Sequence, residues 1–160
     1  MRKRLTMVLI GTMGWLILGC QSAPRPAPSA VDSGDPVLGM LTKGIIQLTV
    51  NINGLDKKMA DLEQAGQAAG PTLRELYALD LSGWKLHQQS MMLQREHLQF
   101  AKQRLLEAKS NPSERPRLRD QWIRHERDYE QALEDLRQQR LALEKLRLQA
   151  ETRLIEQSFL

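Results

Sequence analysis

The side chains best suited to chemistry in this sequence are three histidines, His87, His97 and His125, and a single cysteine, Cys20. The histidines lie ten and twenty-eight residues apart, so no two have the i, i+4 spacing of a helical zinc pair, and no cysteine joins them. No serine lies in a nucleophile-elbow motif, and no glycine loop is present that would cradle a phosphate. The pattern therefore predicts a protein that is not an enzyme and uses no metal or cofactor.

The cysteine stands at the boundary between an apolar run and a polar tail. Three basic residues at positions 2–4 precede residues 5–19, which carry no charge, and this order is typical of a secretory signal peptide. The run is shorter than the roughly 20 apolar residues that a membrane-spanning helix needs. We expect a signal peptide over residues 1–19; the alternative is a signal anchor that an incidental cysteine happens to follow.

The end of the run, Ile17-Leu18-Gly19-Cys20, resembles the lipobox of bacterial lipoproteins. The resemblance implies that the Cys20 thiol receives diacylglycerol, that cleavage occurs between Gly19 and Cys20, and that the new amino group is acylated. Acyl chains worth about 0.8 kcal/mol per buried methylene would give stable anchoring. Gln21, in place of Asp, resembles lipoproteins that are sorted to the outer membrane, so we expect a lipid anchor on its periplasmic side.

Residues 20–36 hold the cysteine and a stretch rich in Pro, Ala and Ser, which cannot form a core. We expect this stretch to be a tether between the membrane and a helical domain over residues 37–160. Three of the 23 basic residues precede the apolar run, and the remaining 20 are balanced by 19 acidic residues. A balance this close to neutral argues against nucleic acid as a partner.

The first predicted helix covers about residues 37–65, after N-cap and N1 signals at Asp35 and Pro36. Apolar residues then alternate at spacings of three and four, which is a heptad stripe that another helix must cover. The stripe consists of Leu38, Leu41, Ile45, Leu48, Ile52, Leu55, Met59 and Leu62. The segment Asn51–Asp56 has two interpretations: a ligand loop or hinge, or a weak, solvent-facing part of a continuous helix.

The second predicted helix covers about residues 72–109, after a break at Gly70 and Pro71, with a possible capping box at Thr72 and Glu75. Two apolar stripes run along it, and we expect them on neighbouring faces that touch two partner helices. One stripe holds Tyr77, Leu81, Trp84, Met91, Leu98 and Leu105, and the other holds Leu79, Leu86, Leu93 and Phe100.

The third predicted helix covers about residues 117–158, after a turn marked by Pro112 and Pro116. Its charges are mixed, and Glu144 with Arg147 has the i, i+3 spacing of an ion pair. Its apolar line consists of Trp122, Tyr129, Leu133, Leu136, Leu143, Leu146, Ala150 and Leu154.

Short turns make consecutive helices antiparallel neighbours. We therefore expect an all-α fold, an antiparallel hairpin of the second and third helices with the first packed along it as a three-helix coiled-coil bundle. The alternative is a parallel homodimer through the first helix. Trp84 and Trp122 have two interpretations as well, because tryptophan serves both as a binding anchor at protein interfaces and as a bulky core residue.

Two segments, Leu73–Gln89 and Leu133–Ser158, are similar to QseG-type outer-membrane lipoproteins. That resemblance implies a lipidated, helical protein that binds the periplasmic region of a QseE-type sensor histidine kinase. We therefore expect a protein partner, with a two-component sensor kinase first among the candidates. The alternative is a structural protein, either a coiled-coil spacer or an accessory of a secretion or envelope machine, which would form a homo-oligomer.

Overall fold

The structure, a computed structural model, describes residues 35–159. The chain divides into two units, Met1–Val31 and Asp32–Leu160, and all described residues belong to the second. The signal peptide predicted over residues 1–19, the lipidation and cleavage sites at Gly19 and Cys20, and nearly all of the predicted tether lie outside the described residues.

The described residues form three long α-helices joined by short turns. α1 spans Pro36–Ala68, α2 spans Pro71–Ser110 and α3 spans Arg115–Ser158, and a short 3-10 helix, η1, covers Pro112–Glu114. Residues 35–159 contain no strand, which confirms the predicted all-α fold. The ends of the three helices lie within three residues of the expected positions.

Asp35 starts α1 as predicted. Its carboxylate accepts hydrogen bonds from the backbone N–H groups of Val37 and Leu38, at 2.8 and 3.3 Å. Such bonds satisfy donors that have no partner inside the first turn of a helix. The same carboxylate forms an ion pair with Lys109, near the end of α2. The cap therefore also ties the start of α1 to the neighbouring helix.

The capping box expected at the start of α2 is wrong. α2 begins at Pro71, its N-cap is Gly70, and no side chain caps it. Glu75, which would have closed the box with Thr72, instead forms an ion pair with Arg153 of α3 at 2.5 Å. Gly70 has no side chain that could cap the helix, and Pro71 fills the N1 position, where a missing N–H costs nothing.

α1 continues without a break through Asn51–Asp56, which confirms the second interpretation of that segment. Gly54 is exposed, whereas Ile52 and Leu55 are buried and form a core cluster with Met91 of α2. The helix thus tolerates residues of low helix propensity here because they face solvent, and its apolar positions still face α2.

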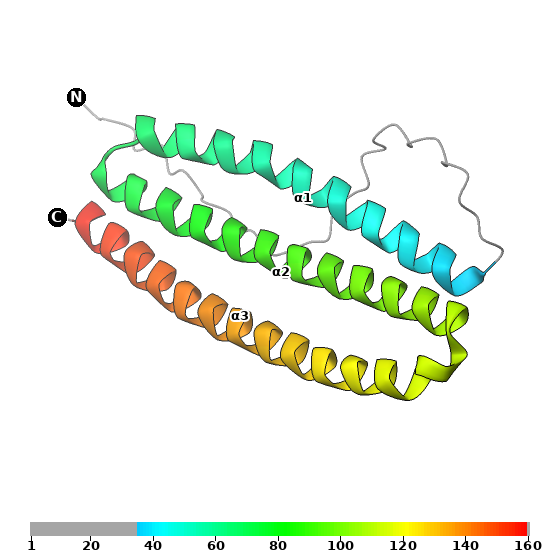
Figure 1. Ribbon diagram of the computed structural model, residues 1–160. Helices are drawn as coiled ribbons and strands as arrows, with labels where there is room; N and C mark the ends of the chain where they lie inside the picture. Colours follow the sequence, from blue (N-terminus) through cyan, green and yellow to red (C-terminus); the bar gives the residue numbers. More distant parts are fainter. Residues whose placement is uncertain (1–34, 160) are drawn as a thin grey trace, which may run out of the picture. The chain divides into compact units, whose positions relative to one another are not determined.

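α2 lies between the other two helices and runs antiparallel to both (Figure 1). On one side, Gln88 donates to the Asp56 carboxylate of α1 at 2.6 Å. On the other, Arg104 donates to the side-chain oxygen of Gln121 of α3 at 2.7 Å. Within the described range, no Cα of α1 comes within 8 Å of a Cα of α3. The bundle is therefore open, with α1 and α3 packed on α2 and not on each other.

The two apolar stripes of α2 explain this arrangement, and our expectation that they share neighbouring faces is wrong. Tyr77 packs against Gly66 of α1, whereas Phe100 of the second stripe stacks on His125 of α3. Tyr77 and Leu79 are two residues apart, so at 3.6 residues per turn about 160° separates them around the helix. Stripes this far apart direct α1 and α3 to different sides of α2.

Few side chains are fully buried, because each outer helix has a single neighbour. The buried hydrophobic residues of the described segment are Leu38, Ile52, Leu55, Met91, Leu118 and Ala150. Many large apolar side chains instead remain more than a third exposed. Among the helices that the structure describes, none has the length and apolarity needed to cross a membrane.

α3 departs from its predicted pattern at two positions. Leu146 was expected on the packed line but is 51% exposed. Arg147 does not pair with Glu144; it lies 3.1 Å from Asp80 of α2 and 3.0 Å from Glu151 on its own helix. Arg147 therefore interrupts the apolar line in order to bind α2, which an intrahelical pattern does not indicate.

Candidate functional site

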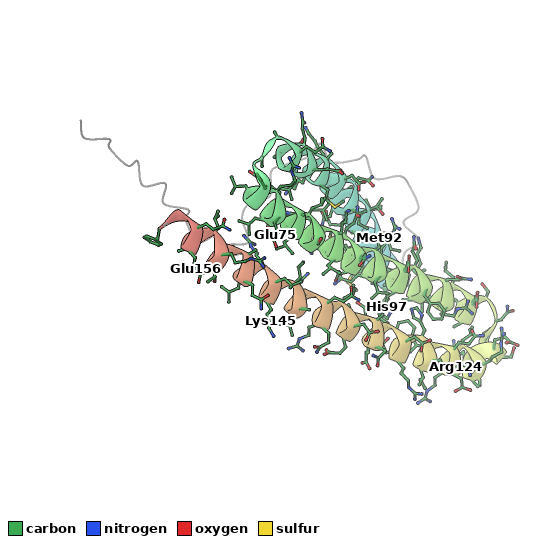
Figure 2. The ribbon with its side chains drawn as sticks, turned by 90° about the vertical axis from the view of Figure 1, so that its left-hand side faces the viewer. Glu75, Met92, His97, Arg124, Lys145 and Glu156 are labelled. Atoms are coloured by element: carbon green, nitrogen blue, oxygen red, sulfur yellow. The ribbon has the colours of Figure 1, made fainter. Side chains whose placement is uncertain are left out.

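Aromatic rings gather between α2 and α3 near the turn that joins them. His97 of α2 stacks on Tyr129 of α3, with 4.1 Å between the ring centroids, and on His125 at 5.3 Å. His125 in turn stacks on Phe100 at 3.9 Å, and Trp122 lies 5.2 Å from His97. Figure 2 shows His97 on the side of α2 that faces α3. We call these five residues the aromatic cluster.

The aromatic cluster contains buried polar atoms. Nδ1 of His97 and Nε2 of His125 are buried without a hydrogen-bond partner among the described residues. Oε2 of Glu126 is also buried, 3.8 Å from Nε2 of His97. Burial and then the nearby His97 lower the pKa of His125 below its usual 6.5, against the opposing effects of Glu126 and Asp128. Burial, followed by Glu126, raises the pKa of Tyr129 above 10.0.

The chemistry that this arrangement offers is proton binding by the His125 imidazole. No group of three His, Cys, Asp or Glu side chains in residues 35–159 is placed to hold a metal ion. A proton added to His125 would put a charge in the packed contact between α2 and α3, where desolvation makes charge unfavourable. The aromatic cluster thus links the packing of the hairpin to pH.

No spacing within a single helix brings His97 and His125 together, so sequence reasoning missed the aromatic cluster. The signal that would have found it is symmetry about the turn. Both histidines lie fourteen residues from Asn111, which follows α2 directly. An antiparallel hairpin places such equidistant positions side by side.

Trp84 and Trp122 are both half-buried. Trp122 belongs to the aromatic cluster, and Trp84 packs against the core cluster between α1 and α2. Lys58 of α1 lies over the Trp84 ring, 5.5 Å from its centroid. His87 lies 6.0 Å from Trp84, and burial, then Arg140 and Lys58, lower its pKa below 6.5.

A groove of about 360 Å³ runs along one side of the contact between α2 and α3. Leu93 of α2, with Ala132 and Leu136 of α3, forms its apolar floor, and Met92 lies at its outer edge, about 100° around α2 from Leu93. Its polar rim consists of Gln89, Glu96, Asp135 and Gln139. We call these eight residues the α2–α3 groove. A second cavity, of about 290 Å³, lies between α1 and α2 beside Gly66 and Tyr77.

An exposed apolar line runs along the last third of α3. It consists of Leu141, Leu148 and Ile155, which are 51, 65 and 57% exposed, and we call it the α3 outer stripe. The two spacings of seven residues place these side chains on one face of the helix. Leu143, which packs beside Gly83 of α2, is two residues from Leu141, and about 160° of helix rotation separates the two. The α3 outer stripe therefore faces away from α2.

Comparisons with known proteins give no further guide, since no family model, curated protein or solved structure matches this chain.

Proposed function

We propose that this chain is a lipid-anchored protein of the bacterial outer membrane, on the periplasmic side, which binds another protein through its helices. The proposed partner is the periplasmic region of a two-component sensor kinase. The observation that carries the proposal is the α3 outer stripe. Three large apolar side chains at heptad spacing, each more than half exposed, are typical of a helix that packs against another helix.

The anchor and the stripe support the same function in different ways. The lipobox-like segment that ends at Cys20, with Gln21 after it, supports attachment to the outer membrane. A partner that binds one conformation of the kinase better than the other changes the balance between signalling states without any ligand of its own. The α3 outer stripe supplies a surface for such binding.

The lipid anchor is tested by labelling cells with radioactive palmitate. We expect label in the wild-type chain and none in a Cys20→Ala variant, which should also leave the outer-membrane fraction. Label retained by the Cys20→Ala variant, or unchanged fractionation, would contradict the anchoring.

Partner binding is tested by placing a photo-crosslinking amino acid at Leu148 of the full chain in living cells. The matched control carries it at Gln149, the next residue, which at 3.6 residues per turn faces about 100° away. We expect the Leu148 probe to crosslink to the periplasmic segment of a histidine kinase and the Gln149 probe to do so at least tenfold less. A Leu148 probe that captures no kinase peptide would refute the proposed partner.

The structural alternative makes a different prediction for the same experiment. A spacer or accessory of an envelope machine would give Leu148 crosslinks to a structural envelope protein, and its deletion would weaken the envelope without changing kinase-dependent transcription. The exposed stripe supports both functions. The resemblance to QseG-type lipoproteins favours the kinase as the partner.

A further inference from the structure

The α2–α3 groove has the form of a receptor for a helix. Each wall contributes residues at i, i+3, i+4 and i+7, namely 89, 92, 93 and 96 from α2, and 132, 135, 136 and 139 from α3. At 1.5 Å per residue each wall extends about 10 Å, or about two helical turns. Ridges of a third helix fit grooves of this spacing. Met92, at the outer edge, is 37% exposed, and its flexible side chain can adapt to a neighbouring helix.

The rim of the groove carries negative charge without a local counter-charge. Neither Glu96 nor Asp135 has a lysine or arginine three or four residues away on its own helix. Within the part of the chain that the structure describes, neither has a cation within 4.0 Å, and Asp135 accepts a hydrogen bond only from Gln131, at 2.9 Å. Other carboxylates of the same helices do form ion pairs, for example Glu75 with Arg153.

The outer face of α1 carries the complementary features. Ile46 and Val50, four residues apart, are 44 and 42% exposed on the side away from α2. Lys43 and Lys57 flank them on that face, and among residues 35–159 neither has a carboxylate within 4.0 Å. We call these four residues the α1 ridge. It is a short apolar surface with a cation beyond each end.

The ridge and the groove lie at the same level along the helices. α1 meets α2 where Asp56 bonds to Gln88 and where Gly44 faces Leu98. Val50 is midway between the two α1 positions, and Leu93 is midway between the two α2 positions. The centre of the α1 ridge is therefore level with the floor of the α2–α3 groove.

The charges match at the same level. Lys43 is level with residue 99 of α2, so about 5 Å along the axis separates it from Glu96. Two contacts set the register of α2 and α3: His97 lies beside Glu126, and Gly83 lies beside Leu143. In this register Asp135 is level with residue 90 of α2. Lys57, level with residue 87, is likewise about 5 Å along the axis from Asp135. The four-carbon stem of lysine spans an offset of this size.

From this match we infer that copies of this chain associate side by side, with the α1 ridge of one copy seated in the α2–α3 groove of the next. The copies are parallel and have no offset along the helix axes, so their Asp35 ends lie at one level, as the lipid anchor proposed above requires. Ridge and groove are different surfaces, so the contact is heterologous and repeats into a ring or an open row. This self-association does not depend on the kinase binding proposed above.

The test uses two differently tagged full-length copies expressed together, one carrying Val50→Cys and the other Met92→Cys. The matched control replaces Met92→Cys with Ser82→Cys, another exposed position on α2 outside the groove. With a short thiol crosslinker we expect at least tenfold more product between the two tags from the Val50–Met92 pair. Equal products from both pairs, or no Val50–Met92 product, would overturn the self-association.

Charge reversal makes the test specific. Adding Glu96→Lys and Asp135→Lys to the Met92→Cys copy should reduce its product with Val50→Cys at least tenfold. Adding Lys43→Glu and Lys57→Glu to the Val50→Cys copy should then restore most of it. Product that survives the first pair of substitutions, or is not restored by the second, counts against the charge match, provided that circular dichroism shows unchanged helicity.

The Leu148 photo-crosslink, measured in the same strains, separates the two proposals. Loss of the Val50–Met92 product with kinase capture intact would refute only the self-association. Self-crosslinking without kinase capture would refute only the proposed partner.

Discussion

At the scale of single residues, two glycines of α1 have opposite roles although both lie in the same helix. A Cβ added at Gly54 would meet nothing within 4 Å, whereas one added at Gly66 would lie 3.0 Å from the Cβ of Tyr77. Gly54 is a weak point of an exposed helix face, and Gly66 is the site of a close helix–helix contact. The Cβ of Tyr77 is fixed to its backbone and has no rotamer that would relieve the clash.

We expect Gly54→Ala to raise the free energy of unfolding by about 0.5–1 kcal/mol, because alanine loses less backbone entropy in a helix interior. Gly66→Ala gains the same entropy but forces α1 away from α2, so it should be destabilising. Urea unfolding followed by circular dichroism measures both. Equal shifts for the two variants would contradict the close contact at Gly66.

His125 predicts a dependence of stability on pH. Its pKa is lowered below 6.5 in the folded chain, so the unfolded chain binds a proton at a higher pH than the folded chain does. The stability gained from keeping this imidazole neutral is present above pH 6.5 and is lost as the pH falls through the lowered pKa. The free energy of unfolding should therefore decrease from about pH 7.5 to about pH 5.5.

A His125→Phe variant tests this dependence, since phenylalanine retains a flat ring for stacking on Phe100 but does not titrate. We expect a smaller loss of stability over the same pH range. The pKa of His87 is shifted in the same direction, so adding His87→Gln should reduce the loss further. An unchanged pH dependence in the double variant would show that other groups carry it.

At the scale of the helices, the N-cap of α1 has two separable contributions. The Asp35 carboxylate accepts two backbone hydrogen bonds and pairs with Lys109. We expect Asp35→Ala to lower the free energy of unfolding by about 1 kcal/mol through loss of the cap. Asp35→Asn keeps a capping oxygen and removes only the charge, so it should cost less, as a partly exposed ion pair adds about 1 kcal/mol at most. Thermal unfolding that ranked Asn as costly as Ala would contradict the capping role.

The helices themselves could be predicted from sequence because their signals are local. The cap at Asp35, the break at Gly70 and Pro71 and the eight-position stripe of α1 all depend on neighbours along the chain, and the structure agrees with each. The relation between the two stripes of α2 could have been calculated as well, since a two-residue step is about 160° of rotation. The expectation of neighbouring stripes did not take that step into account. Because the stripes lie on nearly opposite sides of α2, α1 and α3 do not contact each other among the described residues, and the bundle is open.

The candidate site was less predictable because it depends on contacts between helices. Arg147 binds Asp80 on another helix, and a search for intrahelical spacing finds Glu144 instead. The α2–α3 groove appears only once the register of two antiparallel helices is known. Residues such as Glu96 and Asp135 have no sequence signal of their own, since an acid among glutamines is also typical of a solvated helix face.

At the scale of the whole described unit, one helix holds the other two together. α1 and α3 contact α2 and have no Cα within 8 Å of each other in residues 35–159. The α1–α2 contact buries Leu38, Ile52, Leu55 and Met91, whereas beyond residue 140 of α3 the one buried hydrophobic residue among those described is Ala150. Stability is therefore unevenly distributed, highest where α2 meets α1 and lowest near the end of α3.

Hydrogen exchange should reveal this gradient. In the chain purified in detergent, we expect the amides around Met91 to exchange slowest among helical segments and those from Leu148 to Glu156 to exchange fastest. The exchange rates should differ by roughly tenfold for each 1.4 kcal/mol of difference in opening free energy.

Dilution separates the stability of the fold from self-association. Seating the α1 ridge in the groove protects residues 89–96 and 132–139 only at high protein concentration, whereas protection by packing within one chain is independent of concentration. Slow exchange over Leu148–Glu156 at every concentration would mean that α3 is held by more than α2, and the α3 outer stripe would then not be available to a partner.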